Sequence, residues 1–141
     1  MLCEQLMKRD ILCISPEDSV EAAACKMRDH NLGFLPVCDR DGNVLGTLTD
    51  RDIAIRCVAD GRPCDTTVRE LMTCEVVACK PMDDVQDAEQ AMGQHQKSRI
   101  MCLDDDGRLV GVISLSDIAQ HEDGERAART MRQVTYREAH V

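Results

Sequence analysis

The sequence predicts an α/β fold made of two copies of one β-α-β-β-α unit. The first observation is a repeated motif, in which a hydroxyl residue ends an apolar strand and an Asp follows three positions later: Thr49 with Asp52, and Ser114 with Asp117. The second is a constant offset of 65 positions, without a gap, that pairs identical residues along both halves. These include Leu6 and Leu71, Pro16 and Pro81, Val20 and Val85, Met27 and Met92, His30 and His95, Gly42 and Gly107, and Gly46 and Gly111. A period this long that occurs only twice indicates a duplicated half-domain and not a repeat array.

The first half contains five predicted elements after a short helical lead-in. Val20, Ala23, Ala24 and Met27 form one apolar helical face, and alternating turn and apolar runs predict the strands. The expected elements are the lead-in 3–7, a strand at 11–14, a helix at 20–30, strands at 34–38 and 44–48, and a helix from 50 to about 60 that packs Ile53, Ala54, Cys57 and Val58 inward.

The second half repeats this order. The expected elements are a lead-in at 68–72, a strand at 76–79, a helix at 84–95, strands at 99–103 and 109–113, and a helix from 115 to about 121. Beyond Gly124, residues 125–138 are expected to form one more helix, with Ala128, Met131 and either Val134 or Thr135 at helical spacing. This helix is either solvated or packs on a partner subunit.

Composition limits the possible partners. A chain of 141 residues is expected to fold around one core shared by both halves. With a net charge of -9, one Phe and one Tyr, it offers neither a phosphate-binding surface nor stacking platforms for bases. We therefore expect no nucleic-acid partner.

The nine cysteines do not indicate a disulfide framework, because their number is odd and most lie in apolar patterns. A reducing compartment with Cys as a small hydrophobe explains them better. The first ten residues carry Glu4, Lys8, Arg9 and Asp10, so no signal-peptide core is expected, and nowhere do 18 apolar residues follow one another. The sequence predicts a cytoplasmic protein with no membrane partner.

The duplicated motif Gly-x-x-[Ser/Thr]-x-x-Asp, which spans 46–52 and 111–117, resembles a tandem pair of CBS domains, known as a Bateman module. The run Phe34-Leu35-Pro36-Val37 is also similar to the strand of that family that ends in Pro-Val. The string 48–53 resembles small stand-alone bacterial members of the hypoxic response protein type. This resemblance divides the chain into repeat 1 (3–61), a linker (62–67), repeat 2 (68–121) and a C-terminal helical extension (122–141).

The resemblance implies pseudo-twofold symmetry, clefts between the repeats that bind adenosine-containing ligands, and homodimers. By matching position, Asp52 and Asp117 would accept hydrogen bonds from ribose hydroxyls, while Thr49 and Ser114 would donate to sugar or phosphate. An apolar slot for adenine would involve Ile14, Val37, Cys79 and Cys102. Each motif taken alone is also an ordinary helix N-cap, and both interpretations can hold together.

Three cations, Arg51, Lys80 and Arg99, are candidates for binding phosphate, with exposed surface positions as the alternative. The second half departs from the family pattern at Met101, which stands where the first half has Pro36, and at Ser98-Arg99, opposite Gly33-Phe34. Because of these departures, we do not expect the two sites to be equivalent.

Catalysis and metal binding find little support in the sequence. No nucleophile has an evident base partner, and the chain has no Cys-x-x-Cys motif and no cluster at zinc-finger spacing. We expect His30 and His95, which are repeat mates at helix ends, to be structural. The sequence thus predicts a non-enzymatic sensor of AMP, ADP, ATP, NAD or S-adenosylmethionine that requires no cofactor and acts on an enzyme or transporter in trans. The alternatives are an interaction dimer with degenerate pockets and a thiol- or metal-responsive sensor.

Overall fold

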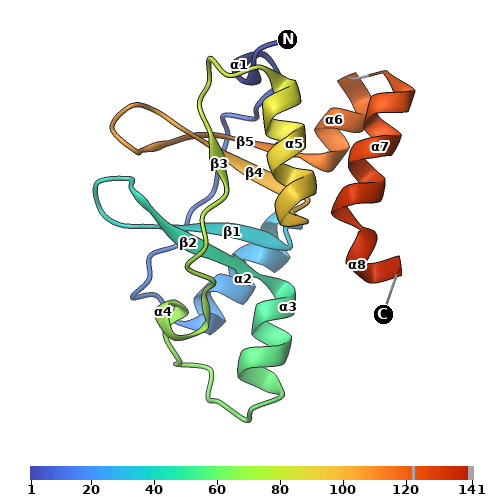
Figure 1. The fold of residues 1–141 in the computed structure, drawn as a ribbon. Helices are drawn as coiled ribbons and strands as arrows, with labels where there is room; N and C mark the ends of the chain where they lie inside the picture. Colours follow the sequence, from blue (N-terminus) through green and yellow to red (C-terminus); the bar gives the residue numbers. More distant parts are fainter. Residues whose placement is uncertain (122, 140–141) are drawn as a thin grey trace. The chain divides into compact units, whose positions relative to one another are not determined.

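Both halves of the computed structural model, which describes residues 1–121 and 123–139, have a similar order of elements, except that the first half has no strand that matches the short one at Ala78–Cys79 (Figure 1). The first half contains α1 (Cys3–Leu6), α2 (Val20–His30), β1 (Phe34–Cys38), β2 (Val44–Thr49), α3 (Asp50–Ile53) and the π-helix η1 (Ala54–Val58). The second half contains α4 (Val68–Leu71), β3 (Ala78–Cys79), α5 (Val85–His95), β4 (Arg99–Leu103), β5 (Leu109–Ser114) and α6 (Leu115–His121), followed by α7 (Gly124–Val134) and α8 (Tyr136–Ala139). The predicted α/β class is confirmed.

Equivalent residues shape the long helix of each half. Ser19 and Asp84, which are repeat mates, cap α2 and α5 by accepting hydrogen bonds from the backbone N–H groups of Ala22 and Gln86. Both helices end on a residue in the left-handed conformation, Asn31 or Gln96, each with φ of 53°. The duplication is therefore visible in the backbone as well as in the sequence.

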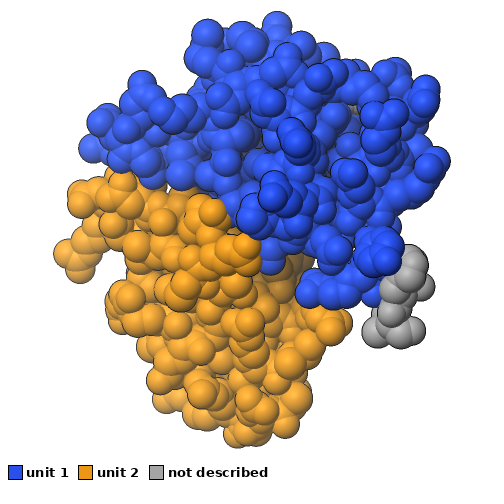
Figure 2. All heavy atoms as spheres, viewed as in Figure 1, with its two compact units in different colours: residues 1–11, 77–141 blue, residues 12–76 orange. Residues whose placement is uncertain are grey.

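Two compact units make up the chain, coloured separately in Figure 2. One consists of residues 1–11 and 77–141, and the other of residues 12–76. Each has its own cluster of buried apolar side chains. The expectation of a single shared core is therefore wrong, because each unit buries enough aliphatic surface to form a core of its own.

Each unit contains most of one sequence repeat and is completed by the first residues of the other. Lys8 pairs with Val112 of β5 through two backbone hydrogen bonds of 2.9 and 3.0 Å, and Thr73 pairs with Thr47 of β2 through two of 2.9 Å. These four residues are repeat mates at the offset of 65. The chain thus leaves one unit after Ile11 and returns to it at Val77.

The strand expected at 11–14 is reduced to a single parallel bridge between Ile14 and Val37. Ile11 belongs to the other unit, and Pro16, which has no N–H and restricts the residue before it, prevents the pairing from continuing beyond Ile14. In the second half the strand expected at 76–79 is confined to Ala78–Cys79, which pairs in parallel with β4, itself antiparallel to β5.

The inward faces of two helices differ from the prediction. Cys57 is buried and Ile53 packs against the core, but Ala54 is exposed and Val58 is 72% exposed. The cause is η1, whose wider turn rotates these residues out of the α-helical face. Ala24 of α2 is exposed as well.

The C-terminal segment forms two helices and is not simply solvated. α7 runs beside α5 (Figure 1), and its packed face contains Thr130 and Val134, with Met131 47% exposed. Arg126 of α7 donates to the buried carboxylate of Glu89 on α5 at 3.1 Å. Of the predicted stripe, Val134 is buried as expected and Ala128 is half-buried, whereas the inward position predicted for Met131 is wrong.

No helix within 1–121 and 123–139 has the length and apolar character needed to cross a membrane.

Substitutions at Gly46 and Gly111 test how tightly the segments around Thr73 and Lys8 pack against β2 and β5. A Cβ on Gly46 would meet the backbone carbonyl of Thr73, whereas a Cβ on Gly111 would meet the flexible side chain of Met7. We expect Gly46→Ala to lower the free energy of unfolding by about 2 to 3 kcal/mol and Gly111→Ala by about 1 kcal/mol, measured by urea unfolding. Gly124→Ala, where nothing lies within 4 Å of the new Cβ, is the control. Equal costs at Gly46 and Gly111 would contradict the description of these contacts.

Candidate functional site

The first hydroxyl–acid corner joins the end of β2 to the start of α3. The backbone N–H of Asp52 donates to Thr49 Oγ1 at 3.1 Å, and the N–H of Thr49 donates to Asp52 Oδ2 at 3.0 Å. This reciprocal pair is a capping box, so the local structural interpretation of the motif is confirmed. Both side chains remain partly exposed.

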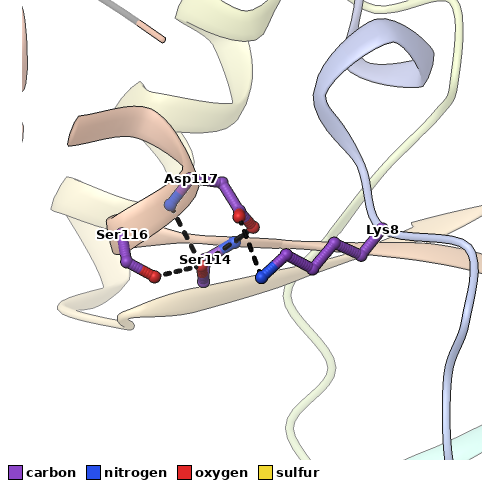
Figure 3. A network of polar contacts seen from close by, with 4 residues as sticks. All are labelled: Lys8, Ser114, Ser116 and Asp117. Atoms are coloured by element: carbon purple, nitrogen blue, oxygen red, sulfur yellow. Dashed lines mark hydrogen bonds and ion pairs between the residues drawn. The ribbon is translucent and has the colours of Figure 1, made fainter. Parts of the chain in front are cut away.

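The second corner has the same architecture at the junction of β5 and α6 (Figure 3). The N–H and hydroxyl of Ser114 both donate to Asp117 Oδ2, at 2.9 and 2.8 Å, and the N–H of Asp117 donates to Ser114 Oγ at 3.1 Å. The hydroxyl of Ser116 lies 2.8 Å from that of Ser114. One carboxylate oxygen of Asp117 is therefore fully engaged within the corner.

Lys8 contacts the other oxygen of Asp117, a contact that the sequence interpretation missed. Its Nζ lies 3.2 Å from Asp117 Oδ1, with the Lys8 side chain 71% exposed and that of Asp117 only 10% exposed (Figure 3). The pairing of Lys8 with Val112 brings the lysine to this corner. The repeat offset indicated that Lys8 and Thr73 occupy equivalent positions. Only the backbone pairing shows that each of them lies beside a hydroxyl–acid corner.

The two corners differ in charge. At the first, Asp50 and Asp52 lie in the same turn, and Asp50 Oδ1 accepts a hydrogen bond from the N–H of Arg51. At the second, Leu115 replaces Asp50 and Lys8 adds a positive charge. The second corner is therefore the less acidic of the two.

The predicted cations lie in different surroundings. Arg51 is exposed beside the first corner, and Arg99 lies directly opposite Ser114 in the β4–β5 register. Lys80 is exposed and forms an ion pair with Asp105 at 3.1 Å, in the turn between β4 and β5. The structure thus places Arg51 and Arg99 next to the corners and associates Lys80 with the hairpin turn.

The residues expected to form an adenine slot lie inside the cores. Ile14 and Val37 are 2% and 0% exposed, while their repeat mates Cys79 and Cys102 are 9% and 0% exposed. The sulfur atoms of Cys79 and Cys102 are 3.4 Å apart. The hydrogen bond with Cys102 and burial raise the pKa of the Cys79 thiol to about 12, although a hydrogen bond with Cys3 opposes the shift. Contact between these four side chains and a ligand remains a prediction.

Within the part of the chain that the structure describes, no group of three or more His, Cys, Asp or Glu side chains is arranged to hold a metal ion.

Comparisons with known proteins place these corners in a wider context. The family model described as "CBS domain" matches residues 3–58 and 68–124. A CBS domain-containing protein of Bacillus subtilis, YhcV, is 36% identical over 135 residues, which cover 95% of both chains.

Two of the solved structures that resemble the chain contain bound ions or small molecules. Hypoxic Response Protein I, with two coordinated zinc ions, has a TM-score of 0.79 and 32% identity, covering 87% of this chain and all of the other. The CBS domain pair of protein MJ0100, in complex with 5′-methylthioadenosine and S-adenosyl-L-methionine, has a TM-score of 0.76 and 26% identity, with 85% and 94% covered.

The cap at the second corner can be measured without a ligand. Ser114→Ala removes the acceptor for the Asp117 N–H, so we expect the free energy of unfolding to fall by about 1 kcal/mol in chemical denaturation. Ser116→Ala is the matched control, because the exposed Ser116 hydroxyl contacts the Ser114 hydroxyl and does not cap the helix. We expect it to change the free energy of unfolding by no more than about 0.5 kcal/mol. If the two variants lost the same stability, the cap would not be the reason for Ser114.

Proposed function

The chain belongs to the CBS domain family as a CBS-pair regulatory module, and we propose that it binds an adenosine-containing ligand at its hydroxyl–acid corners. The ligand class comprises AMP, ADP, ATP, NAD and S-adenosylmethionine. Support comes from the MJ0100 pair, whose structure contains two such adenosine compounds. The proposal assigns the chain a sensing role and no catalytic one.

The observation that carries the proposal is the Asp117 carboxylate, held in place by Ser114 but with its second oxygen contacted by an exposed lysine. Vicinal ribose hydroxyls are two donors that one carboxylate can accept. The Lys8 side chain is 71% exposed, so its ammonium, 3.2 Å from Asp117 Oδ1, can move aside or turn toward a phosphate. At the first corner the carboxylate of Asp52 likewise accepts a hydrogen bond from the backbone N–H of the preceding hydroxyl residue, Thr49.

The charges of the two corners suggest a division of ligands. Lys8 and the neighbouring Arg99 suit the second corner to a phosphate-bearing adenosine. Asp50 and Asp52 suit the first corner to a ligand without phosphate, such as a sulfonium-bearing adenosine.

Binding would act by shifting the chain toward the conformation that holds the ligand better. In this proposal the chain is a homodimer in a reducing compartment, and the shift regulates an enzyme or transporter in trans. An interaction dimer without ligand remains the second hypothesis, and zinc in Hypoxic Response Protein I is the reason to include a metal among the probes.

Thermal unfolding in the presence of AMP, ATP, NAD, S-adenosylmethionine or zinc tests the proposal. At 100 times Kd a ligand adds about 2.7 kcal/mol, which corresponds to a rise in Tm of roughly 5 to 10 °C for a chain of this size. We expect at least one adenosine compound to give such a rise. Asp52→Asn or Asp117→Asn should abolish it, since the amide keeps the shape and an acceptor but loses the charge.

Asp105→Asn, on the exposed hairpin turn, is the matched control and should leave the rise intact. No shift with any adenosine compound would overturn the proposal in favour of an interaction dimer. A shift with zinc alone would overturn it in favour of a metal sensor.

A further inference from the structure

Cys13 and Cys38 lie close together in the unit that consists of residues 12–76, near the residue at which that unit begins. The Cys38 thiol donates a hydrogen bond to Cys13 Sγ at 3.4 Å. Backbone hydrogen bonds fix the pair, because the N–H of Ile14 donates to Pro36 O and the N–H of Cys38 donates to Ile14 O, each at 3.0 Å. From this geometry we propose that Cys13 and Cys38 form a reversible disulfide when the protein meets a hydroperoxide.

The surroundings give the two thiols different roles. Lys26 Nζ donates to the backbone oxygen of Cys13 at 2.8 Å, which brings a positive charge close to that residue. The hydrogen bond from Cys38 and, less strongly, the charge of Lys26 lower the pKa of Cys13 to about 7, although partial burial opposes the shift. The same hydrogen bond and burial raise the pKa of Cys38. At neutral pH Cys13 therefore supplies the thiolate and Cys38 keeps its proton.

Both steps of the reaction balance. The Cys13 thiolate attacks one oxygen of hydrogen peroxide, the O–O bond breaks, and Cys13 becomes a sulfenic acid while hydroxide leaves and takes up a proton as water. Cys38 sulfur, giving up its proton, then attacks Cys13 sulfur, and the sulfenic oxygen leaves as a second water. Two thiols lose two electrons in total, and the peroxide gains them.

Closure requires little movement. A disulfide has an S–S distance of about 2.05 Å, so the two sulfurs must approach by roughly 1.4 Å. Cys13 is partly exposed, which allows peroxide to reach it. The bond would close the loop 13–38, which contains α2 and β1. Cys13 lies two residues after Ile11, where the chain leaves the other unit.

Cys79 and Cys102 are an internal control at the same sulfur separation of 3.4 Å. Both are buried, Cys102 completely, and the pKa of Cys79 is raised to about 12. Proximity is thus equal in the two pairs, whereas access and thiolate content differ. Only the Cys13 pair should react quickly.

The test uses the reduced full chain treated with hydrogen peroxide, blocked with N-ethylmaleimide and digested with trypsin. We expect a cross-link between the peptides 10–26 and 29–40, with two of the nine thiols lost and both restored by dithiothreitol. Because Cys25 shares the peptide 10–26 with Cys13, fragmentation must place the bond at Cys13. The oxidised chain should show a Tm higher by on the order of 5 °C, because the bond restricts the unfolded chain.

Cys38→Ser provides a readout that does not depend on the cross-link. Without its partner, Cys13 should remain a sulfenic acid that dimedone captures, and Cys13→Ser should abolish the capture. Cys64→Ser, at an exposed cysteine, is the matched control and should form the cross-link as the unaltered chain does. Cross-linking of Cys79 to Cys102 at the same rate, intermolecular bonds through Cys64 or Cys74, or peroxide consumption without a Cys13–Cys38 bond would each overturn the proposal.

Discussion

In each unit, the backbone pairing between one sequence repeat and the first residues of the other is the constraint on which the rest of the structure depends. Lys8 with Val112 and Thr73 with Thr47 add a short extended segment beside β5 and β2. Gly46 and Gly111 allow this approach, because neither position has room for a Cβ. Since each of these segments belongs to one sequence repeat and completes the unit that contains most of the other, neither sequence repeat is a complete folding unit by itself.

The pairing of Lys8 with Val112 also determines the charge at the second corner. Lys8 is distant from Asp117 in sequence, and the pairing with Val112 places its ammonium on the buried carboxylate. The equivalent position at the first corner is Thr73, which carries no charge. Two corners with one capping geometry therefore present different charges, and this difference is the basis of the proposed division of ligands.

Much of the fold could be predicted from the sequence, because helix caps, turns and apolar spacing are local signals. The long helices and both hairpins lie where Ser19, Asp84 and the repeated turn residues predict them. The two separate cores, and the pairing of each repeat with the first residues of the other, could not be predicted, because they depend on contacts between residues far apart in the chain. The helical face at Ala54 and Val58 was wrong because periodicity assumes an α-helix, whereas the backbone there is a π-helix.

The candidate site was predictable to a similar degree. The hydroxyl–acid motif identified both corners, since each depends on residues three positions apart. The contact of Lys8 with Asp117 and the meeting of Cys13 with Cys38 could not be predicted, because both result from backbone pairing between segments that are distant in the sequence. The buried positions of Val37 and Cys102 also follow from the cores and not from the strand pattern.

The central claim is that the corners bind an adenosine ligand through their carboxylates, and nuclear magnetic resonance of the ¹⁵N-labelled chain tests it most directly. Titration with AMP and with S-adenosylmethionine should move the amide signals of Asp52 or Asp117, together with those of Thr49 or Ser114. If saturating amounts of both compounds left all four signals unmoved, the account would be contradicted.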